Sequence, residues 1–519
     1  MNPSDFRNEP LLNFRDPDNA RFMRLAIQRT GASMGQEYDL VIGGTRIRTQ
    51  EKIRSLNPAK PHEVVGVHQK AGREHVEPAI QAALAAFESW RNASTWERAG
   101  LGFRVADIIR QRKLEFNAWL VLEAGKNWDE AEADTCEAID FCDLYARLAL
   151  QLDQAEPLVQ LDGERDYLRY IPLGVGAVIP PWNFPLAIMC GMTIASVVCG
   201  NTVVLKPSSD TPTIAAKFFE ALEAAGMPSG VVNFCPGSGS TFGRGLVGHP
   251  KTRYIAFTGS RDVGLEINAH AAQPEPGQIW IKRAILEMGG KDAIVVADDA
   301  DLDAAAAGVA ASAFGFQGQK CSACSRAIVD AKVYDAFLGK LVERVGELQI
   351  GDPAANAPVG PVINEGALKS ILDYIELGAQ EGRILTGGKR VTPEGLEDGY
   401  FIEPTVIADV APTARLAQEE VFGPVLAVIR AADFDDAMKI ANGTEYGLTG
   451  ALYTASQEKV ERAVRDFHVG NLYINRKCTG AVVGAHPFGG FNMSGTDSKA
   501  GGADYLYLFT QAKSIGHKI

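Results

Sequence analysis

One segment decides the fold class of this chain: residues 174–205 read GVGAVIPPWNFPLAIMCGMTIASVVCGNTVVL. Short apolar runs bounded by Gly and Pro are typical of buried strands, and the longer apolar stretch between them is typical of a helix. The segment predicts four elements in order: a strand over 174–179, a turn over 180–184, a helix over 186–198 and a strand over 202–205. Because Lys206 follows the second strand directly, it falls at the sheet edge where open α/β folds bind ligands.

The same region raises the question of a membrane span. No charged residue occurs over 171–205, a stretch longer than the ~20 apolar residues that a membrane-spanning helix needs. Prolines and asparagines interrupt it at positions 180, 181, 183, 185 and 201. Since unpaired backbone at that depth of a bilayer is costly, we predict a buried βαβ unit and no membrane span.

Further strand-to-helix units follow. A strand over 231–235 leads into Gly237-Ser-Gly-Ser-Thr-Phe-Gly243. This motif is one residue longer than the usual dinucleotide-binding fingerprint. Two interpretations of Gly239 therefore stay open: it lies at a bound phosphate or in an ordinary turn. The alternation of strands and helices from about residue 173 onward predicts an α/β architecture with mainly parallel sheets.

A third unit has a strand over 253–257 and a helix from about residue 261. Ser260 at the helix start either binds a phosphate or only caps the helix. Upstream of residue 173 the pattern is mostly helical, as in residues 106–124. Residues 157–169 place a polar Asp-Gly-Glu between apolar alternations, which predicts a hairpin.

Composition limits the possible functions. A length of 519 residues corresponds to two to four domains at about 150 residues each. With 46% hydrophobic and 22% charged residues, the chain is neither disordered nor collagen-like. A net charge of −13 without basic runs predicts no nucleic-acid partner. Residues 1–18 lack the apolar core of a secretory signal, so the expected compartment is the cytoplasm.

The cysteines do not indicate a disulfide framework or a metal site. The chain is long and acidic, and its eight cysteines are scattered. Cys321-x-x-Cys324 has the spacing of a redox or zinc motif, but no second pair lies at ligand spacing. We therefore predict no metal.

Three residues have settings that suit catalysis. Cys321 ends a glycine-containing polar cluster beside Lys320, which fits a nucleophile, although a buried structural cysteine fits as well. Glu287 ends an apolar run before two glycines and is either a general base or a solvated turn residue. Asn183 lies in a Pro-restrained turn, where its amide donates to an oxyanion or only completes the turn.

Seven motifs stand in the order and spacing of the aldehyde dehydrogenase superfamily, which this sequence resembles over nearly its whole length. They are Pro181-Trp-Asn-Phe-Pro185, Lys206-Pro207, Phe257-Thr-Gly-Ser260, Glu287-Met-Gly-Gly-Lys291, Gly318-Gln-Lys-Cys321, Glu419-Glu-Val-Phe-Gly-Pro424 and Pro487-Phe-Gly-Gly490. This resemblance favours the catalytic interpretation of Cys321, Glu287 and Asn183.

The resemblance implies a mechanism with NAD as cofactor. Cys321 attacks the aldehyde carbon, the Asn183 amide and the Cys321 backbone N–H hold the oxyanion, and Glu287 activates the water that hydrolyses the thioester. The implied cofactor-binding residues are Lys206, Ser209, Gly239, Ser260, Glu420 and Phe422. Many relatives that prefer NAD carry Glu three residues after the ribose-binding lysine. Since Ser209 does not repel a 2′-phosphate, NADP use remains possible.

The resemblance also implies a fold. A Rossmann-type nucleotide domain is expected from 1–156 and 173–284, and an α/β catalytic domain from 285–489. A β-hairpin oligomerisation element is expected from 157–172 with 490–519. We thus expect a homo-oligomer, either a dimer or an assembly of dimers.

Within the superfamily the chain most resembles the 1-pyrroline-5-carboxylate dehydrogenases, which oxidise L-glutamate 5-semialdehyde in proline catabolism. The segments that carry this likeness are Phe6-Arg-Asn-Glu-Pro10, Gly125-Lys-Asn-Trp128, Glu137-Ala-Ile-Asp-Phe141, Gly315-Phe-Gln-Gly-Gln-Lys-Cys-Ser322, Phe467-His-Val-Gly-Asn-Leu-Tyr473 and Thr479-Gly-Ala481. Some relatives are fused to a proline dehydrogenase domain. The length of this chain leaves no room for one, so a separate proline dehydrogenase is a possible partner.

This likeness implies substrate contacts. Ser322 and the backbone N–H groups of Gly480 and Ala481 hold the α-carboxylate, and Phe184 and Phe488 flank the methylene chain. Glu137 orients the ammonium group or has a structural role. Two other interpretations stay open: an aldehyde dehydrogenase for a substrate such as succinate semialdehyde, and a catalytically silent homologue.

Overall fold

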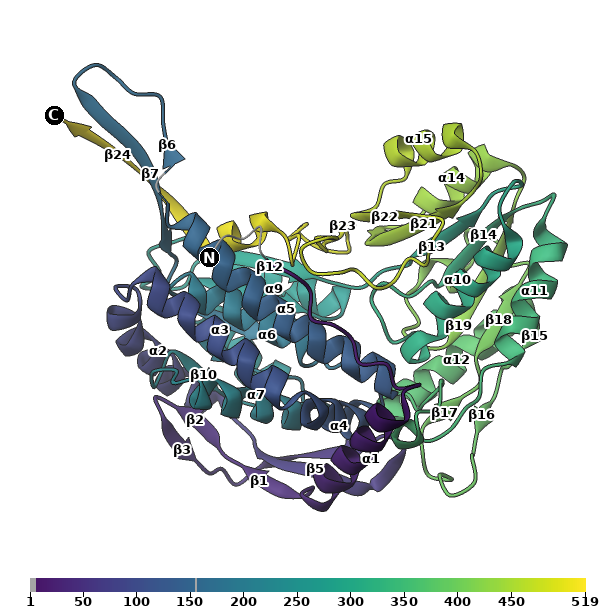
Figure 1. Cartoon of the computed structure of the whole chain (residues 1–519), viewed down its shortest axis with the longest axis horizontal. Helices are drawn as coiled ribbons and strands as arrows, with labels where there is room; N and C mark the ends of the chain where they lie inside the picture. The colour runs from purple at the N-terminus through teal and green to yellow at the C-terminus, as the bar shows by residue number, and fades with distance from the viewer. Residues whose placement is uncertain (1–5, 155) are drawn as a thin grey trace.

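The computed structural model describes residues 6–154 and 156–519. The described chain forms two lobes, each built on a seven-stranded sheet, and an arm that projects from the first lobe (Figure 1). Both sheets are mainly parallel and carry helices, so the predicted α/β architecture is confirmed.

The first sheet has the order β12-β11-β8-β9-β10-β2-β3, and the strands from β12 to β10 run parallel. Its strands are β12 (Arg283–Glu287), β11 (Tyr254–Thr258), β8 (Val175–Ile179), β9 (Thr202–Leu205), β10 (Val232–Phe234), β2 (Leu40–Ile42) and β3 (Thr45–Ile47). Helix α6 (Ala187–Val198) connects β8 to β9, which confirms the predicted βαβ unit.

The strand order of this sheet reverses beside β8, since β9 lies on one side of it and β11 on the other. Open α/β sheets bind ligands at such a reversal, outside the carboxyl ends of the strands. Here the chain leaves β8 into the turn that carries Asn183, and it leaves β11 into helix α9 (Arg261–Ala271). The fold thus brings two predicted site segments to one edge.

The second sheet has the order β15-β18-β19-β14-β13-β21-β22, and only β15 runs antiparallel to its neighbour. Its strands are β15 (Arg383–Thr386), β18 (Thr405–Ala408), β19 (Val425–Ala431), β14 (Arg326–Asp330), β13 (Ala293–Val296), β21 (Thr449–Tyr453) and β22 (Asn471–Ile474). Residues 288–292 link β12 to β13 and so cross from the first lobe to the second, and the chain returns to the first lobe after β22.

Helices cover both sheets. Those of the first lobe are α1 (Pro17–Ala32), α2 (Val76–Trp90), α3 (Thr95–Gln111), α4 (Lys113–Ala124), α5 (Trp128–Leu152), α6, α7 (Pro212–Ala224), α8 (Arg244–Gly248) and α9. Those of the second are α10 (Leu302–Phe314), α11 (Tyr334–Gly346), α12 (Glu365–Glu381), α13 (Arg415–Gln418), α14 (Phe434–Asn442) and α15 (Gln457–Asp466).

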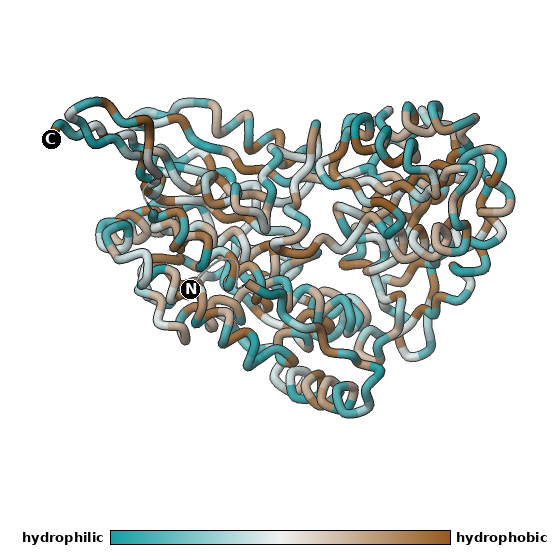
Figure 2. Tube along the Cα trace, turned by 45° about the horizontal axis from the view of Figure 1, so that its top comes forward, coloured by the Kyte–Doolittle hydropathy of each residue, from teal (hydrophilic) through white to brown (hydrophobic). Residues whose placement is uncertain are grey.

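Apolar side chains on both faces of each sheet explain why the helices pack there. Along β8, Val178 belongs to one apolar cluster, whereas Ala177 and Ile179 belong to another on the opposite face. Strand β13 divides its residues in the same way. Figure 2 shows hydrophobic segments running through the interior of both lobes and hydrophilic ones on outer helices and loops. Strands buried on both faces read as continuous apolar runs, which made them recognisable.

The prediction of a mostly helical chain before residue 173 is partly wrong. Besides β2 and β3, this region forms a three-stranded sheet of β1 (Gln36–Tyr38), β5 (Lys60–Gln69) and β4 (Lys52–Asn57). Strands of three residues are too short to show a period of two, and the β4–β5 pairing shifts register twice. The helix expected over 106–124 is divided between α3 and α4 at Arg112.

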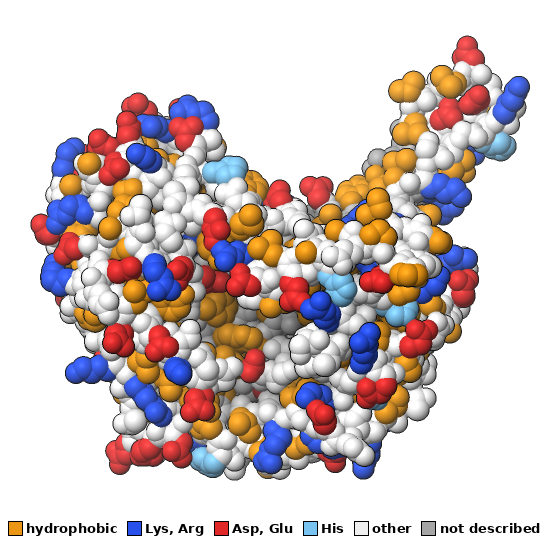
Figure 3. Space-filling view, turned by 180° about the vertical axis from the view of Figure 1, so that it is seen from behind, with side chains coloured by type: hydrophobic (Ala, Val, Ile, Leu, Met, Phe, Trp, Pro, Cys, Tyr) orange, Lys and Arg blue, Asp and Glu red, His pale blue; other side chains and the backbone are white. Residues whose placement is uncertain are grey.

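The arm confirms the predicted hairpin. Strand β7 (Glu164–Pro172) pairs with β6 (Glu156–Pro157) and, along its whole length, with the C-terminal β24 (Thr510–Lys518). Figure 3 shows the arm standing clear of the body with exposed hydrophobic side chains, and the surface hollowed between the lobes. Val159 is 87% exposed and Leu161 61% exposed. The arm therefore presents apolar area to its surroundings.

Two further strand pairs, β16 (Arg390–Val391) with β17 (Phe401–Ile402) and β20 (Tyr446–Gly447) with β23 (Phe491–Asn492), complete the sheets. Over the part of the chain that the structure describes, no helix combines the length and the apolar character needed to cross a bilayer.

Candidate active site

The loop that carries Cys321 follows α10 in an unusual backbone conformation. Phe316 and Gln317 have positive φ angles of 50° and 55°, which cost non-glycine residues energy unless contacts hold them. Gln317 Nε2 supplies such contacts, because it donates to the carbonyl of Pro361 at 2.8 Å and to that of Gly125 at 3.3 Å. The loop then leaves Cys321 partly exposed.

Cys321 lies in an acidic setting. Desolvation raises the pKa of its thiol well above the usual value, and the charges of Asp292, Glu420 and Glu287 raise it further. The thiol is therefore neutral at pH 7, and forming the thiolate requires a base or an added positive charge. Cys324, in contrast, is 1% exposed and packs in an apolar cluster of the second lobe. Among the described residues, no group of His, Cys, Asp and Glu side chains could hold a metal ion.

Glu287 is the last residue of β12 and has one free oxygen. Its Oε1 accepts a hydrogen bond from the Ser498 hydroxyl at 2.6 Å and another from the Ser498 backbone N–H at 3.3 Å. Its Oε2 is buried and makes no close hydrogen bond among the described residues, while the backbone N–H of Gly490 also faces the carboxylate and opposes the rise in its pKa. Burial raises the pKa of this carboxyl to about 7. Such a group exchanges a proton readily near neutral pH, as a general base must.

Asn183 is held against the Cys321 loop. Its side chain is 4% exposed, and Nδ2 donates to the carbonyl of Gln319 at 3.0 Å. Because an amide has two N–H groups, one stays available for another acceptor. Gln319 lies two residues before Cys321, so this bond fixes the amide relative to the thiol.

The residues predicted to bind the nucleotide follow the carboxyl ends of the first sheet. Lys206 Nζ donates to the carbonyls of Pro207 and Gly237 at 3.1 and 3.2 Å, and burial lowers its pKa to about 8. Ser209, three residues later, is exposed. Gly239 starts a π-helical turn over Gly239–Gly243, and a Cβ there would meet nothing within 4 Å. These groups leave room and donors for the ribose and phosphate groups of a dinucleotide.

Ser260 begins α9 without capping it. The residue is exposed, and its side chain accepts no hydrogen bond from the backbone of the helix. The hydroxyl and the first N–H groups of α9 therefore remain available to an anion. Ser260 is thus the N-cap residue of α9 without a side-chain cap hydrogen bond, and phosphate binding there stays a prediction.

Glu420 and Phe422 reach from the second lobe to the linker between the lobes. Glu420 Oε1 accepts from the backbone N–H of Gly290 at 3.0 Å, and burial raises its pKa to about 7. A Cβ at Gly289 would overlap the Glu420 carboxylate, so a larger residue there would displace that side chain. Phe422 packs edge-on against Trp182, with ring centroids 5.4 Å apart.

On the other side of Cys321, α5 and the turn after β8 supply the predicted substrate residues. Phe184 packs edge-on against Phe316, with centroids 6.4 Å apart. Lys126 Nζ lies 4.0 Å from the Phe184 centroid and forms a fully buried ion pair with Asp134 at 2.9 Å. Burial, and then the charge of Asp134, raise the pKa of Glu137 to about 8. This carboxyl is neutral at pH 7 before any cation binds.

Tertiary contacts bring the predicted carboxylate-binding segment to Ser322. The Ser322 carbonyl accepts from Cys478 Sγ at 3.4 Å, and Arg476 donates to the Gly480 carbonyl at 2.9 Å. Gly480 has φ of +76°, which favours glycine, and Ala481 follows it. Phe488, the other residue expected to flank the substrate, pairs with Ala500 through backbone hydrogen bonds of 2.8 and 2.7 Å.

Sequence reasoning missed Ser498 and Lys126. Ser498 is 211 residues from Glu287 in the chain, and its neighbours form no motif that the sequence analysis used. Lys126 lies in the segment Gly125-Lys-Asn-Trp128, but nothing in that pattern indicates that its charge is buried between two phenyl rings. Only the folded arrangement identifies either residue.

Comparisons with known proteins show the family and the fold of this chain. The profile of the aldehyde dehydrogenase family matches residues 46–515. A 1-pyrroline-5-carboxylate dehydrogenase of Geobacillus thermodenitrificans is 56% identical over 512 residues, which cover 98% of each chain. The structure of a Thermus 1-pyrroline-5-carboxylate dehydrogenase with bound NAD is 49% identical, covers 99% of both chains and superposes with a TM-score of 0.97. Proline utilization A from Bdellovibrio bacteriovorus is 43% identical with a TM-score of 0.97, and the match covers 100% of this chain and 54% of that one.

Proposed function

Because the chain belongs to the aldehyde dehydrogenase family, we propose that it oxidises L-glutamate 5-semialdehyde to L-glutamate with NAD. This aldehyde is the open form of 1-pyrroline-5-carboxylate, and its oxidation is the second step of proline catabolism. One observation carries the proposal: Cys321, Asn183 and a Glu287 with a free oxygen meet at the junction of the lobes.

Cys321 is the nucleophile of the proposed reaction. The Cys321 thiol would lose its proton to water under the positive charge that bound NAD brings. The thiolate then attacks the aldehyde carbon, and the negative charge that develops on the aldehyde oxygen is stabilised by the Asn183 amide and the Cys321 backbone N–H. The bond from Asn183 to Gln319 orients the amide before substrate arrives. Such preorganised donors stabilise the oxyanion without a reorganisation cost.

The residues near the first sheet edge fit NAD. Lys206, Ser209, Gly239 and Ser260 would hold its adenosine and phosphate groups, and Glu420 and Phe422 its nicotinamide end. NAD, when bound, supplies the hydride acceptor that turns the aldehyde adduct into a thioester. Ser209 carries no charge to repel a 2′-phosphate, so the proposal includes measurable use of NADP.

Glu287 completes the cycle. With a pKa of about 7 and a buried Oε2 that lacks a protein partner, it can accept the proton of a water that attacks the thioester. Oε1 is already held by Ser498, so the free oxygen has a fixed direction. Hydrolysis releases the acid and restores the Cys321 thiol.

We further propose how the substrate is held. Ser322 and the N–H groups of Gly480 and Ala481 bind the α-carboxylate, Phe184 and Phe488 flank the methylenes, and Glu137 faces the ammonium group. An incoming cation lowers the pKa of Glu137 and so favours its charged form.

The proposal extends to organisation and partners. Residues 1–156 and 173–284 form the nucleotide domain and 285–489 the catalytic domain, although residues 1–5 and 155 lie outside the described ones. The exposed arm, formed by β6, β7 and β24, joins subunits of a homo-oligomer that is a dimer or built from dimers. The oligomerisation element expected over 490–519 is too long, because Tyr505, Leu506 and Phe509 are buried in the core of the first lobe and only 510–518 pair with β7. A cytoplasmic proline dehydrogenase supplies the substrate.

A steady-state assay tests the function. NADH formation is measured with glutamate 5-semialdehyde, succinate semialdehyde and pentanal under identical conditions. We expect kcat/KM for glutamate 5-semialdehyde to exceed that for pentanal by at least about a hundredfold, since unpaired carboxylate donors penalise the simple aldehyde. A preference for succinate semialdehyde would assign the site to another substrate, and no turnover of any aldehyde would favour a silent homologue.

A further inference from the structure

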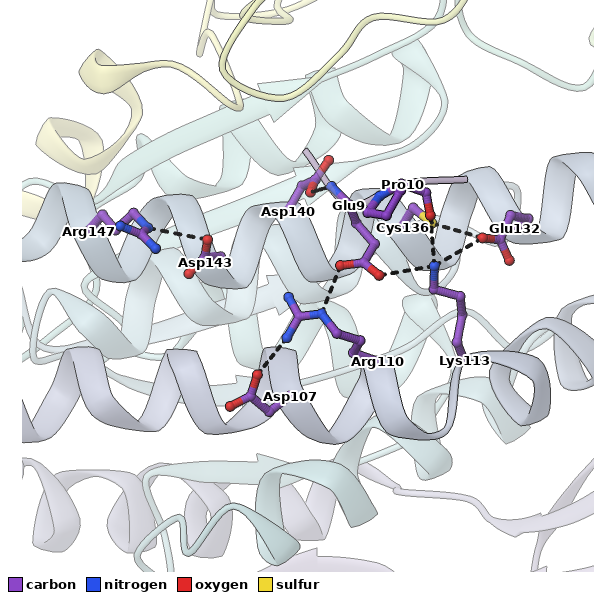
Figure 4. A network of polar contacts seen from close by, with 10 residues as sticks. All are labelled: Glu9, Pro10, Asp107, Arg110, Lys113, Glu132, Cys136, Asp140, Asp143 and Arg147. Atoms are coloured by element: carbon purple, nitrogen blue, oxygen red, sulfur yellow. Dashed lines mark hydrogen bonds and ion pairs between the residues drawn. The ribbon is translucent and has the colours of Figure 1, made fainter. Parts of the chain in front are cut away.

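Residues 6–13, here called the N-terminal strap, lie across helix α5 and are bound on several sides. Glu9 accepts a hydrogen bond from Arg110 at 2.8 Å and forms an ion pair with Lys113 at 3.1 Å. Lys113 also donates to the Pro10 carbonyl at 3.0 Å. Figure 4 shows this network between the strap, α3, the start of α4 and α5. These contacts fix the N-terminal strap to the helices of the first lobe.

Within the strap, Asn8 makes a bridge. Its Nδ2 donates to Asp140 Oδ2 at 2.8 Å and to the carbonyl of Val483 at 2.9 Å, so both amide hydrogens are used. The backbone N–H of Glu9 donates to Asp140 Oδ1 at 2.7 Å. Asp140 is 6% exposed and lies on α5, three residues after Glu137. Asn8 thus links α5 to Val483, which is 475 residues from Asn8 in the chain.

Val483 belongs to residues 479–484, here called the anchor loop, which contains Gly480 and Ala481. The loop is held at its other points by Arg476, which donates to the Gly480 carbonyl, and by Gly484, whose N–H donates to the Gly501 carbonyl at 2.9 Å. Phe6 of the strap contacts Gly484, since a Cβ there would lie 3.1 Å from its ring. The N-terminal strap therefore contacts the anchor loop at Val483 and Gly484, whereas Arg476 and Gly501 hold it at other points.

We propose that Asn8 and Asp140 are positioning residues that set substrate specificity by holding the anchor loop. They fix the Val483 carbonyl and thereby the direction of the Gly480 and Ala481 N–H groups that receive the α-carboxylate. The inference rests on the proposed function for the identity of that ligand. Neither residue touches the reacting carbon, so both act on binding of the distant end of the substrate and not on the chemical step.

Asn8→Ala and Asn8→Asp test the proposal, the second because a carboxylate cannot donate to Val483 and repels Asp140. We expect KM for glutamate 5-semialdehyde to rise about tenfold, because misdirected N–H donors bind the α-carboxylate less well. The kcat for this substrate and the kcat/KM for pentanal should change less than about twofold. The matched control is Arg110→Ala, which removes an ion pair of Glu9 in the same strap but leaves Asn8, Asp140 and Val483 in place. It should lower the melting temperature without raising this KM.

The rate of hydrogen exchange at the backbone N–H groups of 480–484 measures how firmly the anchor loop is held, and it needs no substrate. We expect faster exchange in both Asn8 variants than in wild type and Arg110→Ala. Three results would each overturn the proposal. The Asn8 variants could lose kcat/KM equally for both aldehydes, Arg110→Ala could raise KM as much as they do, or hydrogen exchange in the Asn8 variants could stay at the wild-type rate. The wild-type preference among aldehydes tests the function alone. If that preference failed while loop exchange still depended on Asn8, the proposed ligand would be wrong and the strap contact would stand.

Discussion

The Ser498 hydroxyl donates to Glu287 Oε1 across 2.6 Å, whereas Oε2 of the same carboxylate is buried without a described partner. Ser498 in the C-terminal segment thus fixes Oε1, and we propose that Oε2 accepts the proton of the attacking water. A hydrogen bond to a carboxylate favours its charged form, so Ser498 opposes the rise in pKa that burial imposes on Glu287.

Ser498→Ala removes this hydrogen bond and should raise the pKa of Glu287 further. Less of the base is then ionised at pH 7, so we expect kcat to fall about threefold to tenfold there, with the pH profile displaced to higher pH. Measuring kcat from pH 6 to 9 checks this. Ser498→Thr retains the hydroxyl and should keep the wild-type profile, and an unchanged profile in Ser498→Ala would contradict the assigned role.

Glu287→Gln should separate the two halves of the reaction. Acylation depends on the thiolate, whereas deacylation needs the base, so we expect a burst of NADH near one equivalent and then a slow phase. In wild type the steady rate should rise with pH through about 7, because the ionised fraction of Glu287 grows there, and the variant should lack this limb. Stopped-flow absorbance measures both. If the variant gave no burst while Cys321 still reacted with iodoacetamide, Glu287 would act on the thiol.

The two cysteines of the Cys-x-x-Cys pair should differ sharply. Cys321→Ala removes the sulfur that we propose as the nucleophile and should abolish oxidation. Cys324→Ala should retain most activity and lose about 1 kcal/mol of folding free energy, since Cys324 is 1% exposed in an apolar cluster. Initial rates and urea unfolding provide the comparison. Full activity in Cys321→Ala would refute the assignment.

Cofactor choice can be tested at Ser209. The neutral, exposed hydroxyl should allow turnover with NADP, and Ser209→Glu should lower kcat/KM for NADP at least about tenfold more than for NAD, through repulsion of the 2′-phosphate. Ser209→Gln, similar in size but uncharged, is the control. Equal effects on both cofactors would mean that the adenosine ribose lies away from residue 209.

Ser322→Ala should narrow the preference for glutamate 5-semialdehyde over pentanal. The variant loses one donor to the α-carboxylate, so we expect kcat/KM for the amino-acid aldehyde to fall about tenfold while that for pentanal stays within about twofold. Both constants come from one steady-state series. Parallel losses would place Ser322 in the reaction of every aldehyde and not in recognition.

The sequence by itself determined the α/β class and the β8–α6–β9 unit, because buried parallel strands and their helices are continuous apolar runs that local composition reveals. It also indicated the hairpin of the arm, through a polar Asp-Gly-Glu between apolar alternations. Through the order of its motifs it also indicated Cys321, Glu287 and Asn183. Each of them lies within a few residues of the glycines or prolines of a recognisable motif. The short strands β1 to β3 escaped, since three residues carry too little pattern.

Only the tertiary structure decided how these residues act on one another. The bonds from Ser498 to Glu287 and from Asn8 to Val483 join segments 211 and 475 residues apart, and no local pattern encodes such a pairing. The pKa of about 7 at Glu287 likewise comes from burial between lobes, a property of the packed molecule. Sequence sets which side chains exist and what local backbone they prefer, whereas desolvation and long-range contacts arise only when both sheets and both ends of the chain have come together.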